Sequence, residues 1–203
     1  MYKVFGLTGG IGTGKSTVSN IWREAGLPIV DADELAKFVV RPKSEALYAL
    51  VDEFGEGILN GHELDRAALA EVMFFRPDAK EIVEGIIHPK VRELSKQRFM
   101  ELGADHPLIC YDCPLLFETQ LQKELRPVVV VSCSESLQIK RVTERNYSWS
   151  FRQVKARIAS QLPLTDKVSQ ADFVIDNSST LNDLKSQSLQ VLEDVRKFLT
   201  SES

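Results

Sequence analysis

Eight residues near the N-terminus, Gly9 to Ser16, constrain what this chain can fold into more than any other segment. They read GGIGTGKS and match G-x-x-x-x-G-K-[ST], the pattern of a phosphate-binding loop. The mostly apolar run Lys3–Thr8 before the loop is typical of a buried strand, and Thr17–Ala25 after it carries apolar residues at helical spacing. Because strand, glycine-rich loop and helix are the context that this motif needs, we predict a nucleotide-phosphate site rather than an accidental glycine-rich turn.

Each part of the loop would meet a different demand of a phosphate chain. Glycines let the backbone approach closely, so that its N–H groups point inward, and the N-terminus of the next helix adds a positive dipole end. Lys15 is predicted to reach the β- and γ-phosphates, and the Ser16 hydroxyl is predicted to bind Mg²⁺.

Length and composition limit the class of protein. The 203 residues, 43% hydrophobic and 27% charged, indicate one domain with a buried core and room for insertions. A net charge of −4 argues against nucleic acid as a partner. The N-terminus lacks the pattern of a signal peptide and no apolar run could cross a bilayer, so we expect a cytoplasmic protein without membrane contact. Nothing in the sequence indicates an obligate protein partner.

The three cysteines, Cys110, Cys113 and Cys133, do not indicate a disulfide framework, because their number is odd and no secretion signal accompanies them. Cys110 and Cys113 form a C-x-x-C pair, but a zinc site needs a second ligand pair and none stands nearby. We expect Cys110 to fill space on a buried strand.

Four further apolar runs follow the first strand, and they are nearly continuous rather than alternating, which is typical of strands covered on both faces. Helical patterns lie between them. Alternating strands and helices, with a phosphate-binding loop after the first strand, predict an α/β fold with a doubly wound parallel sheet of five strands. The four runs are Pro28–Val30, Leu108–Tyr111, Val128–Val131 and Phe173–Ile175.

From about Glu34 to Met100 the sequence shows only helical signals. Leu47 to Phe54 has one apolar face, Asp65 is placed to N-cap a helix over Arg66–Phe75, and Asp78 is placed to cap a helix that Pro89 interrupts. Such an insertion usually covers the acceptor site of a small kinase, and an unusually long crossover is the alternative. We predict a single domain, residues 1–203, with its core in 1–33, 106–139 and 168–200, a helical acceptor-binding insertion at about 34–105, and a lid at about 140–167.

Acidic residues follow two of the predicted strands. Asp31 and Asp33 come after the second strand, at the end where ligands bind in parallel sheets, and a carboxylate there can orient or deprotonate an attacking hydroxyl. Either of them could instead cap the helix that begins near Glu34; we favour the functional role for Asp33 and leave Asp31 open. Asp112 ends the third strand, as does the carboxylate that holds Mg²⁺ in many phosphate-binding proteins.

Residues 140–167 hold seven basic and two acidic side chains within a chain of net negative charge. Arg141, Arg145 and Arg152 are placed to close over the phosphates, where an arginine can neutralise the charge that spreads over the γ-phosphoryl oxygens. A solvated basic helix face is the alternative, and it suits Lys155 better than Arg141.

Taken together, these features resemble one family, dephospho-coenzyme A kinase, along nearly the whole chain. The resemblance rests on an ordered set of motifs rather than on the phosphate-binding loop, which many families share. Thr13, where the family usually has Ser, and Asn146, where an Asp commonly follows the lid arginine, depart from its pattern. The motifs are Gly6–Gly12 with Gly14–Thr17, Asp31–Asp33, His88-Pro89 with Val91, Asp112–Glu118, Gln138–Arg141 with Arg145, and Gln161, Lys167 and Ala171–Asn177.

This resemblance implies a P-loop kinase that transfers the γ-phosphoryl group of ATP, with Mg²⁺, to the ribose 3′-hydroxyl of dephospho-coenzyme A, giving coenzyme A and ADP in the last step of that biosynthesis. It implies that Asp33 orients or deprotonates the 3′-hydroxyl, that Lys15 and Arg141 stabilise the moving phosphoryl group, and that Ser16 and Asp112 serve Mg²⁺. The implied ATP contacts are Gly10, Ile11, Gly12, Thr13, Gly14, Lys15, Ser16, Thr17, Arg145 and Asn177, and the implied acceptor contacts are Asp33, His88, Pro89, Leu116, Phe117 and Glu118.

Two other functions fit parts of the sequence. Shikimate kinase also places Asp-x-Asp after its second strand, but it uses a Gly-Gly pair near the third strand, and the Gly-Gly of this chain is Gly9-Gly10 in the loop. A GTP-dependent switch protein would need an Asn-Lys-x-Asp motif after a strand, and the sequence has none.

Overall fold

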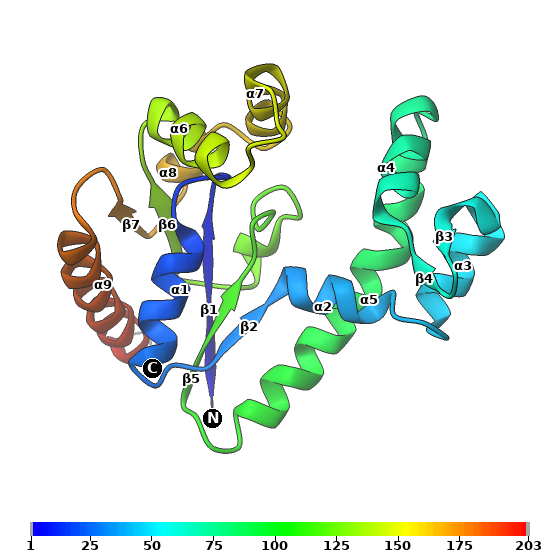
Figure 1. The fold of residues 1–203 in the computed structure, drawn as a ribbon. Helices are drawn as coiled ribbons and strands as arrows, with labels where there is room; N and C mark the ends of the chain where they lie inside the picture. The colour runs from blue at the N-terminus through cyan, green and yellow to red at the C-terminus, as the bar shows by residue number, and fades with distance from the viewer. Residues whose placement is uncertain (1, 202–203) are drawn as a thin grey trace. The chain divides into compact units, whose positions relative to one another are not determined.

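The computed structural model describes residues 2–201 and divides them into two compact units (Figure 1). Unit 1 takes in the chain up to Val30 and again from Glu101 onward, and unit 2 takes in Asp31–Met100. Unit 1 therefore contains both the phosphate-binding loop and the basic segment 140–167. None of the helices in the described part of the chain combines the length and the apolarity that a bilayer span needs.

A five-stranded parallel sheet confirms the predicted α/β fold. The strand order is β2-β5-β1-β6-β7, so that β1 lies in the middle and pairs in parallel with both β5 and β6. All five predicted apolar runs became these strands, within one or two residues of the expected ends. The strands span Lys3–Gly9 (β1), Ile29–Asp31 (β2), Leu108–Asp112 (β5), Val128–Ser132 (β6) and Phe173–Asp176 (β7).

The main apolar core of unit 1 lies between the sheet and two helices, α1 (Lys15–Glu24) and α9 (Leu181–Ser201), which run side by side in Figure 1. Trp22 of α1 is fully buried, stacks edge-to-face on Phe5 of β1 at 5.6 Å, and donates its indole N–H to the Ser188 carbonyl of α9 at 2.9 Å. This packing fixes the helix that follows the phosphate-binding loop against the central strand.

The basic segment 140–167 runs through three shorter helices of unit 1. Each of the first two begins at a serine whose hydroxyl accepts a backbone N–H of the first turn, an arrangement typically worth about 1 kcal/mol. Ser150 and Gln153 form a reciprocal capping box. The helices are α6 (Glu135–Arg145), α7 (Phe151–Ala159) and α8 (Leu164–Ser169), and a short 3₁₀ turn, η2, covers Leu121–Lys123.

Unit 2 has its own core, in which Leu50, Ile58, Leu69 and Val83 are buried. The expected N-cap is confirmed: the Asp65 carboxylate accepts the N–H groups of Ala67 at 2.9 Å and Ala68 at 3.0 Å. The elements are α2 (Ala32–Val39), α3 (Glu45–Phe54), the 3₁₀ turn η1 (Glu56–Ile58), β3 (Leu59–Asn60), β4 (Glu63–Leu64), α4 (Arg66–Phe75) and α5 (Ala79–Leu102).

Two expectations for this region are wrong. The stretch is not purely helical, because β3 and β4 form an antiparallel hairpin whose turn starts at Gly61, with φ 63. Pro89 does not interrupt its helix: α5 runs on through it for 24 residues. A proline removes one backbone hydrogen bond, and the many remaining bonds of a long helix can keep it continuous. The carboxylate of Asp78, which was expected to cap this helix, forms an ion pair with the Arg76 guanidinium, with 2.9 Å between Oδ1 and Nε.

Candidate active site

The loop between β1 and α1 has a backbone that only glycine adopts easily. Gly12 and Gly14 have φ of 78 and 93, in the left-handed region. A Cβ on Gly12 would lie 2.8 Å from the Gln138 carbonyl of α6, and one on Gly14 would overlap the side-chain amide of Asn177. The helix after β6 and the residue after β7 therefore pack closely against the loop. This packing fixes the shape of the loop before any ligand binds.

Replacing Gly14 by alanine is expected to weaken MgATP binding at least about tenfold, because displacing the loop costs at least one charge-assisted hydrogen bond, worth about 1.5–3 kcal/mol. Gly26→Ala is the matched control. Gly26 has a similar φ of 84, but no atom lies within 4 Å of its Cβ position, so both variants carry the same left-handed strain of about 1–2 kcal/mol. Equal ATP affinities by calorimetry in the two variants would contradict this.

Asn177 connects three elements at the loop. Its side-chain amide donates to the Thr13 carbonyl at 2.8 Å, and its own carbonyl accepts from Arg141 of α6 at 2.9 Å. Thr13 in turn donates its hydroxyl to the Gly10 carbonyl at 2.8 Å. This bracing role is one that the sequence analysis missed, since it assigned Asn177 only to ATP binding; a contact with ATP stays a prediction.

Lys15 and Asp112 are brought together. Asp112 ends β5 opposite Leu7 of β1, is 1% exposed, and forms an ion pair with the Lys15 ammonium. Ser16, in the first turn of α1, is exposed. The structure therefore places a carboxylate, an ammonium and a hydroxyl at the end of the central strands, beside the N-terminus of a helix.

The donor atoms around the loop fit a magnesium ion that arrives with a nucleotide. Among the residues that the structure describes, no group of three or more His, Cys, Asp or Glu side chains could hold a metal by itself. Magnesium usually takes only one or two protein oxygens and completes its shell with phosphate oxygens and water. The Ser16 hydroxyl and the Asp112 carboxylate are such hard oxygen donors.

Of the predicted lid arginines, Arg141 lies in the interior and the other two at the surface. Arg141 is half-buried, and its Nη1 atom is buried without a hydrogen-bond partner among residues 2–201. Arg145, in the last turn of α6, and Arg152, in α7, are exposed. A half-buried guanidinium with a spare donor is a strong anion-binding group, so Arg141 is the member of the basic segment best suited to meet a phosphate.

The cysteines near Arg141 and along β5 have the surroundings of unreactive thiols. Cys110, Cys113 and Cys133 are buried free thiols. Burial raises the pKa of the Cys110 thiol well above its ordinary value. Burial also raises the pKa of Cys133, although the Arg141 guanidinium offsets part of the rise. Because a thiolate is the reactive form, protonated buried thiols suit a packing role.

The two aspartates after β2 have different surroundings. Asp31 is the N-cap of α2: its carboxylate accepts the N–H of Asp33 at 2.8 Å and of Glu34 at 3.2 Å. The capping alternative therefore holds for Asp31. Asp33 lies in the first turn of the same helix with an exposed side chain, within unit 2.

The predicted acceptor contacts are divided between exposed and buried residues. His88 and Pro89 are exposed on α5, in unit 2. In unit 1, Leu116 and Phe117 are buried, and Leu116 occupies the space that a side chain at position 6 would need. Glu118 forms an ion pair with Lys167 at 2.7 Å. Contacts of these residues with an acceptor stay predictions.

Comparison with known proteins decides the family. A family model described as dephospho-CoA kinase matches residues 3–183. The chain belongs to the dephospho-CoA kinase family. This confirms the resemblance seen in the motifs and argues against the shikimate kinase and GTP-switch alternatives.

Individual relatives of this dephospho-CoA kinase family member match along most of its length. It is 43% identical over 180 residues to the dephospho-CoA kinase of Bdellovibrio bacteriovorus, covering 87% of this chain and 88% of that protein. It is 40% identical to the dephospho-CoA kinase of Geobacillus kaustophilus, covering 95% and 96%. The crystal structure of TT1252 from Thermus thermophilus superposes with a TM-score of 0.82 at 34% identity, covering 96% and 98%.

Proposed function

We propose that this protein transfers the γ-phosphoryl group of ATP to the ribose 3′-hydroxyl of dephospho-coenzyme A, giving coenzyme A and ADP. Membership of the dephospho-CoA kinase family carries the choice of acceptor. The observation that carries the reaction type is a preshaped glycine loop with Lys15, Asp112 and Arg141 around it. The loop, Lys15 and Arg141 can bind and neutralise a phosphate chain, as phosphoryl transfer requires, and Asp112 can hold the magnesium ion that comes with it.

The reaction needs few protein groups. The 3′-oxygen attacks the γ-phosphorus as the bond from that phosphorus to the β,γ-bridging oxygen breaks, and ADP leaves with that oxygen. We assign Asp33 to hold the attacking hydroxyl and to accept its proton. Lys15 and Arg141 would neutralise charge on the transferring group, and the N–H groups of the loop would hold the phosphates that do not move.

Ser16 and Asp112 would hold Mg²⁺ when it binds with ATP, and the ion would then supply positive charge that offsets the charge of the phosphates. In the structure the Asp112 carboxylate is compensated by Lys15. The ion pair stabilises the charged form of this buried carboxylate, and the charged form is the one that binds either the Lys15 ammonium or Mg²⁺. A cytoplasmic location and the lack of a nucleic-acid or protein partner stay predictions.

The deciding test is ADP release from MgATP with and without dephospho-coenzyme A, with the product identified by mass. We expect an acceptor-dependent rate and a product heavier by one phosphoryl group, on the ribose 3′-oxygen. Shikimate and free pantetheine serve as control acceptors. Folded protein that binds ATP and phosphorylates none of them, or prefers shikimate, would overturn the assignment of the acceptor.

A further inference from the structure

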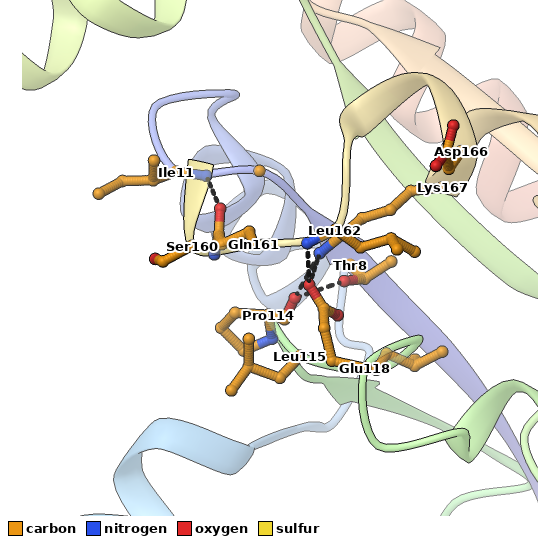
Figure 2. A network of polar contacts seen from close by, with 12 residues as sticks. Thr8, Ile11, Pro114, Leu115, Glu118, Ser160, Gln161, Leu162, Asp166 and Lys167 are labelled. Carbon is orange, nitrogen blue, oxygen red and sulfur yellow. Dashed lines mark hydrogen bonds and ion pairs between the residues drawn. The ribbon is translucent and has the colours of Figure 1, made fainter. Parts of the chain in front are cut away.

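Two glutamines bind the backbone of one residue of the phosphate-binding loop, Ile11. The N–H of Ile11 donates to Gln161 Oε1 at 2.8 Å, as Figure 2 shows. The Ile11 carbonyl accepts from Gln138 Nε2 at 2.7 Å. Both backbone groups of Ile11 are thus bonded by side-chain amides that come from residues more than 120 positions away in the chain.

Gln138 and Gln161 flank residues 140–160, the part of the basic segment that holds its arginines. Gln138 is 3% exposed in α6, two residues before Lys140, and lies one helical turn from Arg141 on the same face. Gln161 follows α7, before α8. Residues 140–160, with Arg141, Arg145 and Arg152, therefore lie between two glutamines that both bind Ile11.

An ion pair between a buried lysine and a partly exposed glutamate fixes the segment that carries Gln161. Lys167 is 0% exposed, and its ammonium lies 2.7 Å from the Glu118 carboxylate and 3.0 Å from the Pro114 carbonyl. Glu118 also accepts the N–H of Leu162, the residue next to Gln161, at 2.9 Å. Figure 2 shows these bonds converging on Pro114 and Glu118.

The same ion pair reaches the strand that leads into the loop. The Pro114 carbonyl accepts the Thr8 hydroxyl at 3.1 Å as well as the Lys167 ammonium. A buried lysine is costly unless it is paired and fully hydrogen-bonded, and here Lys167 joins the end of β1, the turn after β5 and α8. One apolar residue at position 167 could fill the same buried space without these hydrogen bonds. The network therefore indicates a role beyond packing.

We propose that Gln161 is a positioning residue of the phosphoryl-transfer site, with the Lys167–Glu118 pair holding it in place. It fixes Ile11, and with it the inward-facing N–H groups of the following loop residues, and it anchors the C-terminal end of the arginine-bearing segment to the loop. This inference rests on the proposed function. The effect on rate follows because donors that are already in place need no reorganisation when charge develops on the phosphoryl group.

Two substitutions at position 161 separate positioning from packing. Gln161→Ala removes the acceptor of the Ile11 N–H and is expected to lower kcat about 3- to 10-fold, the equivalent of one net hydrogen bond, with little change in KM for ATP. Gln161→Glu keeps an acceptor oxygen but adds a negative charge. It is expected to keep kcat within about twofold and to raise KM for ATP. Gln190→Ala, at an exposed position of α9, is the control and should match wild type.

Amide hydrogen exchange of Ile11 in the ligand-free protein tests the contact without any acceptor substrate. We expect faster exchange at Ile11 in Gln161→Ala, and wild-type protection in Gln161→Glu and Gln190→Ala. Unchanged Ile11 exchange in Gln161→Ala, or equal losses of kcat in the Ala and Glu variants, would overturn the proposal. If wild-type protein fails to phosphorylate dephospho-coenzyme A, the proposed function fails, while the exchange result still decides the role of Gln161.

The double variant Lys167→Met with Glu118→Leu tests the support of Gln161. Removing both charges avoids the unpaired Glu118 carboxylate that Lys167→Met alone would leave against an apolar side chain, so the double variant should fold and melt near wild type. It cannot bind the Leu162 N–H, so Ile11 exchange should accelerate as in Gln161→Ala. A folded double variant with wild-type Ile11 exchange would show that the ion pair does not position Gln161.

Discussion

Asp33→Asn is expected to lower kcat by roughly 10²–10⁴-fold, the usual range for losing a general base, while the affinity for MgATP stays close to wild type. The amide keeps the size and hydrogen-bonding capacity of the side chain but cannot accept the proton of the 3′-hydroxyl. ATP affinity should persist because the groups that we expect to bind ATP lie in unit 1, whereas Asp33 lies in unit 2. Single-turnover rates and calorimetric ATP titration measure the two quantities separately.

Asp31→Asn is the matched control, since it is the same chemical change two residues earlier. Asp31 caps α2, and asparagine caps a helix about as well as aspartate. This variant should therefore keep its kcat and its thermal stability. Near-normal turnover in Asp33→Asn would remove Asp33 from the role of base, and an equal loss in both variants would point to the helix start rather than to one carboxylate.

The fold could be predicted because its signals are local. Each strand of the main sheet is a short, nearly continuous apolar run, and the loop after β1 has a pattern that few other structures need. The cap at Asp65 was also predictable, because a capping side chain acts within three residues. The hairpin of β3 and β4 was missed although Asn60-Gly61 is a turn signal, because strands of two residues are too short to show alternation.

From the sequence, only those members of the candidate site that would touch the phosphates or the metal could be proposed, and their roles stay predictions. Lys15, Ser16 and Asp112 have types and positions that phosphate chemistry explains, so a sequence motif can find them. The bracing residues Gln138, Gln161 and Asn177 act through contacts with backbone atoms more than 120 residues away. Gln161 and Lys167 carried a signal as members of the family pattern, but that pattern gave no role, because their partners are set by the three-dimensional fold.

The different roles of Asp31 and Asp33 show the same limit at short range. The sequence offered two carboxylates and one helix start, and either residue could have capped it. Backbone geometry decided the matter, because the residue in extended conformation just before the first helical turn can direct its side chain to the free N–H groups. Asp33 lies inside the helix, and its side chain is exposed.

Arg141→Ala is expected to lower kcat by about 10³-fold or more, within the range of 10³–10⁵ known for arginines that stabilise phosphoryl transfer, and to weaken dephospho-coenzyme A binding less than about tenfold. Its contact would strengthen as charge spreads over the transferring group, so the loss belongs to the transition state. Lys140→Ala is the control: Lys140 precedes Arg141 on α6 but is exposed, and its removal should leave kcat nearly unchanged.

Arg141 also donates to the Asn177 carbonyl, so part of the loss could come from a displaced loop rather than from a missing charge. Adding guanidinium to Arg141→Ala separates the two causes. If the charge is what matters, the small cation should enter the space of the lost side chain and restore kcat at concentrations that leave Lys140→Ala unaffected. Arg141→Lys keeps a charge but lacks the planar fork, so it should recover only part of the rate. A loss confined to acceptor affinity, with kcat intact, would assign Arg141 to substrate binding instead.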